Sequence, residues 1–448
     1  MQTQHNHLLR VLGLVFGLAA VVGSVVGQGI LRSPGIVAQA SGSPAVLIGL
    51  WALGAALSLL AALPFAELGA AIPRAGGAIA YAERAFGPRA RVVTAFTLVL
   101  LMVSSQAMLA FVTGEFLVRL GIGGGRYGPG ELATGLLVLF FLVNAMGTRI
   151  SGAMQIGFSG LKGAVLIGLV VVLFSQPGAA PDPVPGPAVA AGWFGFGAAM
   201  LVIIGAYNGW GDLAVYGEEI ENPGHAIPRA LFGGILGVAA LYLAVNLALL
   251  HSLTPAEMAR SDFAAADAAR GVFGDRGDMI FTTFGVLSVG AITSLGLMST
   301  SRVVFATARA GILPRWFARV TDRGTPMRAL ALSTLGSAAF LWSDAYLALS
   351  ATSNTLSQCM FVLVALTAMA LRRKEPDMLR PYRMPLYPLS IWLVLGFDLV
   401  LLAVFVVQDP YYSLLGVVLV AALSAGYLLL ARLRNVAPEE TIEWPSPS

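Results

Sequence analysis

A succession of apolar runs divides this sequence, and each run is long enough to cross a lipid bilayer as a helix. About twelve such runs occur, since a spanning helix needs roughly 17–25 apolar residues. Only 11% of the residues are charged, against about 25% in a soluble domain. The sequence therefore predicts an all-α polytopic membrane protein. The runs lie near residues 8–39, 44–72, 92–118, 131–147, 150–174, 193–219, 226–250, 279–308, 326–342, 344–371, 386–407 and 411–433.

Basic residues are concentrated in every second connection between these runs. They cluster at residues 74–91, 309–328 and 372–383, whereas the connection at 176–192 contains no Lys or Arg. Because cytoplasmic loops are enriched in Lys and Arg, this pattern predicts a multi-pass protein of the cell (inner) membrane with both termini in the cytoplasm. The net charge of +4 fits loops that face an anionic lipid leaflet and does not suggest nucleic-acid binding.

The first apolar run is interrupted by glycines in the stretch GSVVGQGI, which contains Gly23, Gly27 and Gly29. A glycine inside a helix costs roughly 1 kcal/mol relative to alanine. Unwound backbone at membrane depth is tolerated only where it is buried in protein or lines a cavity. We therefore expect this helix to break near Gly27 and its freed backbone groups to bind a ligand.

The sixth run is interrupted in the same way. Its sequence LVIIGAYNGWGDLAV places Gly205, Gly209 and Gly211 around Tyr207 and Trp210. Glycines can also serve only to let membrane helices pack closely. Two matched breaks, five spans apart, instead favour a transporter built from inverted repeats with its site between them.

This symmetry predicts the organisation of the chain. The first repeat would comprise spans one to five (1–175), and the inverted second repeat would comprise spans six to ten (193–371). Two accessory helices (386–433) and a cytoplasmic tail (434–448) would lie outside the repeats.

A broken helix offers two kinds of backbone group. The half-helix that begins near Gly29 presents free N–H groups and the positive end of its dipole, which suits a carboxylate. Free carbonyls are expected around Val25 and Val26, and around Gly205 and Ala206 in the sixth run, and these suit an ammonium group. The two breaks together suit a zwitterion, an α-amino acid. We expect no carboxylate side chain at either break, so a polyamine fits less well.

Lys162 lies in the middle of the fifth run, about twelve residues or roughly 18 Å from either end. Its side chain is too short to reach the interface, so it must face the interior of the bundle. Ser104 and Ser105 lie in the middle of the third run. They could line the binding pocket or form hydrogen bonds between helices.

Several stretches resemble the amino acid–polyamine–organocation permeases. These stretches are GSVVGQGI, AELGAAIPRAGGAIAYAERAFGP, AYNGWGDLAVYGEEIENPGHAIPRA, STSRVVFATARAGILPRWFARVTDRGTPMRAL and LRRKEPDMLRPYRMPLYP. Within that family, AYNGW is most similar to the AY-x-GW of the L-type exchangers and their bacterial relatives. The resemblance implies a LeuT-like 5+5 inverted repeat with broken first and sixth helices.

The resemblance also implies roles for individual residues. Backbone amides at Gly27, Gln28 and Gly29 would hold the substrate carboxylate. Carbonyls near Val25, Val26, Gly205, Ala206 and Asn208 would hold the substrate amine. Tyr207, Gly209 and Trp210 complete the predicted substrate-binding set. Gln28 replaces a small hydroxyl residue of the family. Gly205 stands where many relatives have a bulky aromatic gate, so either Tyr207 or Trp210 gates instead or the pocket is simply wider.

In sodium-independent members of the family, a lysine of the fifth helix occupies the place of a sodium ion. The resemblance therefore implies that Lys162 contacts the first break near Gly23 or Val26, and the eighth span near Ser299 and Thr300. Lys162 would replace sodium structurally or carry a proton. The only cysteine of the chain, Cys359, lies in the tenth run, so no disulfide-linked heavy chain is expected.

The sequence favours a transporter over an enzyme. Its four histidines lie at the ends of runs or in loops, and no HExxH motif or paired intramembrane carboxylate occurs. No metal and no cofactor is expected. The predicted function is sodium-independent transport of neutral L-amino acids by alternating access and exchange. Proton-coupled transport of an amino acid or amine, with Lys162 as the proton carrier, remains the alternative. No sequence feature specifies an oligomeric state.

Overall fold

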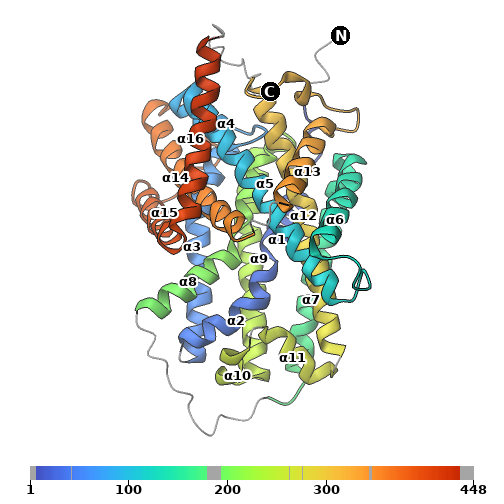
Figure 1. Cartoon of the computed structure of the whole chain (residues 1–448). Helices are drawn as coiled ribbons and strands as arrows, with labels where there is room; N and C mark the ends of the chain where they lie inside the picture. The colour runs from blue at the N-terminus through green and yellow to red at the C-terminus, as the bar shows by residue number, and fades with distance from the viewer. Residues whose placement is uncertain are drawn as a thin grey trace.

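Helices make up nearly all of the chain in the computed structural model, which describes residues 7–41, 43–178, 193–261, 263–274, 276–342 and 346–433. The tail at 434–448, most of the connection at 176–192 and the side chain of Gln28 lie outside the described residues. Two isolated β-bridges are the only extended pairings found within the described ranges. The all-α architecture is confirmed (Figure 1).

The elements follow one another in this order: α1 (Leu14–Val25), α2 (Gln28–Ser41), α3 (Pro44–Ala71), α4 (Ala78–Phe86), α5 (Pro88–Arg119), α6 (Pro129–Ala145), α7 (Thr148–Phe174), α8 (Trp193–Tyr207), the 3₁₀ helix η2 (Trp210–Val215), α9 (Pro223–Ser252), α10 (Pro255–Arg260), α11 (Ala264–Phe273), α12 (Arg276–Arg309), the 3₁₀ helix η3 (Arg315–Ala318), α13 (Met327–Leu341), α14 (Tyr346–Lys374), α15 (Leu389–Gln408) and α16 (Pro410–Leu433).

The predicted spans can be recognised among these helices. In the described part of the chain, nine helical segments are long and apolar enough to cross a membrane, and the bent pair α1–α2 makes a tenth. The fourth and ninth predicted runs form the shorter apolar helices α6 and α13, of 17 and 15 residues. At 1.5 Å per residue these two rise about 25 Å and 22 Å, less than the roughly 30 Å of a bilayer core.

Three short helices lie in the connections between spans. α4 follows the PRAGG stretch, and α10 and α11 fill the connection between α9 and α12. α10 begins with a capping box, in which Thr254 and Glu257 each accept a hydrogen bond from the other's backbone amide. The Gln39 side chain donates to the Ala259 carbonyl at 2.6 Å, which ties α10 to the end of α2.

The described chain begins and ends at the same end of the bundle. The Leu8 amide donates to Glu218, and Glu218 pairs with Arg309 at the end of α12. Two residues further on, the Gly311 carbonyl accepts a hydrogen bond from Tyr427 of α16. Figure 1 shows α10 and α11 at the opposite end of the bundle. α15 and α16 pack mainly on α14, at the outer side of the bundle.

Candidate substrate site at two interrupted helices

Both predicted helix interruptions are present. α1 ends at Val25 and α2 begins at Gln28, with a bend of 49° between them. α8 ends at Tyr207, and the chain turns through Asn208 and Gly209 before the tighter helix η2 begins at Trp210. The first helical residues of α2 have no intrahelical partners for their amides, and the last residues of α1 have none for their carbonyls.

Two glycines allow the breaks to touch. A Cβ atom on Gly29 would lie 2.6 Å from the Ala206 Cα atom, which brings the backbone of α2 directly against α8. Gly209 has φ of +119°, a backbone conformation that residues other than glycine rarely adopt. A Cβ atom there would lie 2.8 Å from the Ser24 carbonyl oxygen. The Ser24 hydroxyl donates to the Gly209 carbonyl at 3.1 Å and joins the two breaks.

Gly29→Ala is expected to lower the midpoint of thermal denaturation and to weaken ligand binding between the two breaks at least tenfold. The added methyl group meets backbone rather than a movable side chain, and such overpacking costs about 1–3 kcal/mol. The control is Gly160→Ala in α7, where a Cβ atom meets no atom within 4 Å. Both measurements can be made on purified protein, in detergent and in liposomes. Wild-type behaviour of Gly29→Ala would contradict this close packing.

Lys162 extends from α7 to the carbonyl end of α1. Its Nζ atom donates to the Gly23 carbonyl at 2.7 Å and to the Val26 carbonyl at 3.0 Å, and the side chain is only 2% exposed. Among the described residues, no carboxylate forms an ion pair with it. Its charge is therefore met by backbone dipoles at the negative end of a helix.

The eighth span contributes a different hydroxyl from the two expected. Ser288 of α12 donates to the Val26 carbonyl at 3.0 Å, beside Lys162. Ser299, eleven residues or about 16 Å further along the helix, hydrogen-bonds with Tyr216 instead, and Thr300 donates to Gly296 in its own helix. The structure thus brings Gly23, Val26 and Lys162 together and places neither Ser299 nor Thr300 in hydrogen-bond contact with them.

Tyr242 of α9 joins the two breaks, and the sequence reasoning did not identify it. Its buried hydroxyl lies 3.0 Å from the Val25 carbonyl and 3.1 Å from the Ala206 carbonyl, one from each break. The ring packs against Trp51 and Tyr207, with centroids 5.4 and 5.1 Å away. A phenol ring in the seventh run, whose other polar residues are Arg229 and Asn246, was the only available signal.

These contacts change which carbonyls remain open to a ligand. A carbonyl oxygen has two lone pairs, and Val26 uses both, for Lys162 and for Ser288. Val25 and Ala206 each use one at most, because Tyr242 has a single proton to donate. The Gly209 carbonyl likewise uses both lone pairs, for the Ser24 hydroxyl and the Asp212 amide. The predicted amine site is therefore reduced to the carbonyls of Val25, Gly205 and Ala206.

A cavity of about 490 Å³ lies between the two breaks. It is bordered by α2, α5, α8, α12 and α14, and its far wall carries Ser353, Asn354 and Ser357. Nine of the predicted site residues line it, namely Val25, Gly27, Gly29, Ser105, Gly205, Ala206, Asn208, Gly209 and Ser299.

Other predicted site residues point away from this cavity. Tyr207 is 1% exposed and packs against Trp51 and Tyr242, and Trp210 packs against Phe65 and Phe361. Neither ring lines the central cavity, so neither one closes it in this conformation. Ser104 is buried, and its hydroxyl lies 2.7 Å from that of Ser353, which makes it an interhelical contact.

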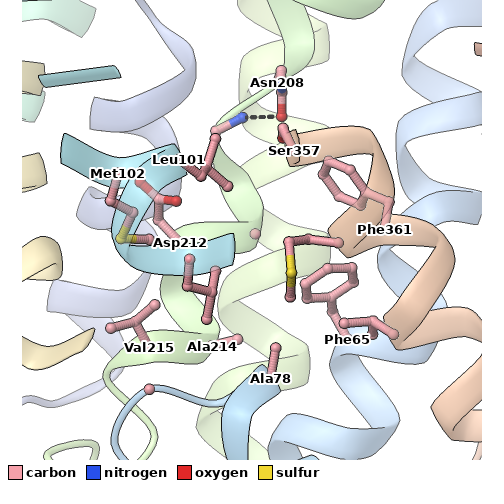
Figure 2. Close-up of a pocket in the computed structure, with 16 residues that line it drawn as sticks. Phe65, Ala78, Leu101, Met102, Asn208, Asp212, Ala214, Val215, Ser357 and Phe361 are labelled. Atoms are coloured by element: carbon pink, nitrogen blue, oxygen red, sulfur yellow. Dashed lines mark hydrogen bonds between the residues drawn. The ribbon is translucent and has the colours of Figure 1, made fainter. Parts of the chain in front are cut away.

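The expectation that no carboxylate lies at a break was wrong. Asp212, in the first turn of η2, lines the central cavity together with Arg32 of α2. Asp212 also borders a smaller pocket of about 70 Å³, which extends from the second break toward the start of α4. Figure 2 shows Asn208 and Ser357 at one end of this pocket, Phe65 and Ala78 at the other, and Asp212 on the wall beside Met102. The letters GWGD contained this signal, directly after Gly211.

Ion pairs tie the helices together at the end of the bundle that holds Leu8. The Arg302 guanidinium donates two hydrogen bonds of 2.8 Å to Glu219 and one of 2.8 Å to Thr148, and both members of the ion pair are buried. Nearby, burial alone would raise the pKa of Glu218, but its hydrogen bonds and its attraction to Arg309 hold that pKa below the usual value. The loop that follows η2 is thereby fixed to α7 and α12.

The sequence is similar to a protein family and to several known proteins. The model of the family described as "Amino acid permease" matches residues 9–427. The serine/threonine exchanger SteT of Bacillus subtilis is 29% identical over 400 residues, which cover 87% of this chain and 89% of that protein. The Asc-type amino acid transporter 1 of Mus musculus is 28% identical, over 92% of this chain and 79% of its own length. The large neutral amino acids transporter small subunit 2 of Homo sapiens is 26% identical, over 88% and 76%.

Proposed function

Because the chain belongs to the amino acid permease family, we propose that it moves neutral L-amino acids across the cell (inner) membrane by alternating access, in exchange for one another and without sodium. It is a multi-pass membrane transporter and not an enzyme. The observation that carries the proposal is a cavity of about 490 Å³ between two interrupted helices, with Lys162 bonded to the carbonyl end of the first interruption.

The two breaks supply complementary groups for a zwitterion. The substrate carboxylate would bind the amides of Gly27, Gln28 and Gly29, at the positive end of α2. Its ammonium group would bind the carbonyls of Val25, Gly205 and Ala206, at the negative ends of α1 and α8. The Asn208 side chain already accepts from the Gly209 amide at 2.8 Å, so it shapes the cavity wall beside the amine.

Lys162 would make the first break independent of sodium. A sodium ion in such a site would bind carbonyl and hydroxyl oxygens. Here the carbonyls of Gly23 and Val26 already receive the Lys162 ammonium, and Ser288 completes the same cluster. A fixed cation of the protein thus holds the end of α1, and no ion needs to be carried with the substrate.

Transport would require the breaks to move together. The first repeat (1–175) and the second (193–371) would each contribute one broken helix, while the accessory helices (386–433) lie outside this movement. We place the end that holds Leu8 and Tyr427 in the cytoplasm because the basic clusters lie in the connections on that side. Substrate binding would shift the populations of outward- and inward-facing states.

Uptake by purified protein in liposomes tests this function. Labelled serine, alanine and leucine are offered to vesicles that are empty or filled with unlabelled amino acid, with choline in place of sodium. Exchange predicts uptake that requires internal amino acid and is indifferent to sodium and to a proton gradient. Uptake into empty vesicles driven by the proton gradient would instead establish proton coupling. Uptake of no amino acid under either condition would refute the proposed function.

A further inference from the structure

A second cavity opens beside the first, and the proposed exchange of neutral amino acids does not use it. It measures about 240 Å³ and lies among α3, α8, α14 and α15. Five residues border both this side pocket and the central cavity, namely Val202, Gly205, Asn208, Asn354 and Ser357. The two spaces are therefore neighbours across the second break.

Gly205 lies at the boundary between the two spaces. A Cβ atom built on Gly205 would meet no atom within 4 Å, so the space beside it is open. In contrast to Gly29 and Gly209, this glycine is not required by close packing. A side chain at this position would project into this open space, at a residue that borders both cavities.

Asp398 gives the side pocket its charge. It lies in the membrane-spanning helix α15, is 2% exposed, and accepts one side-chain hydrogen bond of 3.0 Å from Gln358. It is the one charged residue that lines the pocket, and no basic side chain in the described ranges forms an ion pair with it. A carboxylate inside a membrane protein needs a cationic partner or marks the path of a substrate.

Much of the remaining lining is apolar or aromatic, although Ser58, Asn354 and Gln408 also border the pocket. Trp210, Phe361, Phe397 and Leu401 surround the approach to Asp398. Such a wall suits the methylene stem of a long side chain, while a carboxylate at its end suits a cationic head. The volume far exceeds the roughly 30 Å³ of one water molecule, so the space is much larger than a proton site requires.

We propose that the side pocket binds the side chain of a basic amino acid, whose backbone occupies the central cavity and whose cationic end pairs with Asp398. This rests on the proposed function, because the central cavity must first hold an α-amino acid. Gly205 admits the side chain, Gln358 orients the carboxylate, and the substrate range then extends beyond neutral amino acids.

The test compares two competitors of equal stem length, L-lysine and L-norleucine, which differ by the terminal ammonium group. Each is added to liposomes that exchange labelled serine, and the ratio of their half-inhibitory concentrations is measured. We expect lysine to inhibit at lower concentration than norleucine. Asp398→Asn keeps the size of the side chain and its hydrogen-bond acceptor for Gln358. It should lower the ratio of the half-inhibitory concentration of norleucine to that of lysine at least tenfold. The control Asp409→Asn removes an exposed carboxylate just beyond the same helix and should leave the ratio unchanged.

A second variant tests the route. Gly205→Leu should weaken inhibition by lysine more than inhibition by serine, because the new side chain projects into the open space beside Gly205. Equal inhibition by lysine and norleucine in the wild type would overturn the inference, while continued serine exchange would leave the proposed function intact. A changed pH dependence in Asp398→Asn with an unchanged competitor ratio would also overturn it, since Asp398 would then hold a proton. Absence of any amino acid exchange would refute both proposals.

Discussion

Lys162→Ala is expected to reduce amino acid exchange at least a hundredfold. The substitution leaves the Gly23 carbonyl and one lone pair of the Val26 carbonyl without a donor in a buried position. Each unsatisfied buried group costs about 1–3 kcal/mol, and every 1.4 kcal/mol corresponds to about tenfold. The carboxyl end of α1 also loses the positive charge that complements its dipole. The measurement is serine counterflow into liposomes at equal amounts of reconstituted protein.

Two further variants separate the charge of Lys162 from its bulk. Lys162→Met keeps the length of the side chain but not the ammonium, and should be nearly as inactive as Lys162→Ala. Lys374→Ala removes the only other lysine of the chain, which donates to the Ala85 carbonyl at 2.6 Å, far from the breaks, and should retain exchange within about twofold. Near-normal exchange by Lys162→Met in sodium-free medium would show that the first break needs no cation.

Arg302→Met is expected to destabilise the protein by about 3–5 kcal/mol, because Glu219 is then left as a buried charge without its partner. The double variant Arg302→Met with Glu219→Gln leaves no unpaired charge and should recover a large part of this loss. The midpoint of thermal denaturation in detergent, followed by tryptophan fluorescence, should therefore be lowest for the single variant.

An exposed ion pair provides the matched control for this experiment. Arg84 forms comparable hydrogen bonds with Glu375, but the two side chains are 43% and 34% exposed. Arg84→Met should cost at most about 1 kcal/mol, since water and salt screen such pairs. If the double variant is as unstable as Arg302→Met alone, the loss arises from packing and hydrogen bonds to Thr148 rather than from the unpaired carboxylate.

Much of the site could be predicted because its chemistry is local. In a bilayer, a helix must satisfy its own backbone groups, so glycine clusters such as those at Gly27 and Gly209 indicate where the backbone opens. A lysine far from either interface has to face the interior, and Lys162 does so at the predicted carbonyls. The breaks and the inward direction of Lys162 followed from these requirements, whereas its contact with Gly23 and Val26 was implied by the resemblance to the permease family.

Partners contributed by other helices could not be predicted in the same way. Ser288 was missed in favour of Ser299 and Thr300, although all three lie on α12. Tyr242 and Asp398 were missed altogether. Membrane helices are apolar on the sides that face lipid and on the sides that face other helices, so hydrophobic periodicity does not reveal which side lines a cavity.

The sequence by itself determined the order of the apolar helices, the positions of the two interruptions and the inward direction of Lys162, because each depends on the cost of exposing polar groups to lipid. The tertiary structure alone decided which polar groups meet. It placed Ser288 and Tyr242 on the broken backbone, Asp212 in the central cavity, and Asp398 in the side pocket that Gly205 borders. These neighbours depend on the rotation and depth at which whole helices pack, and that is settled by side-chain fit across the bundle.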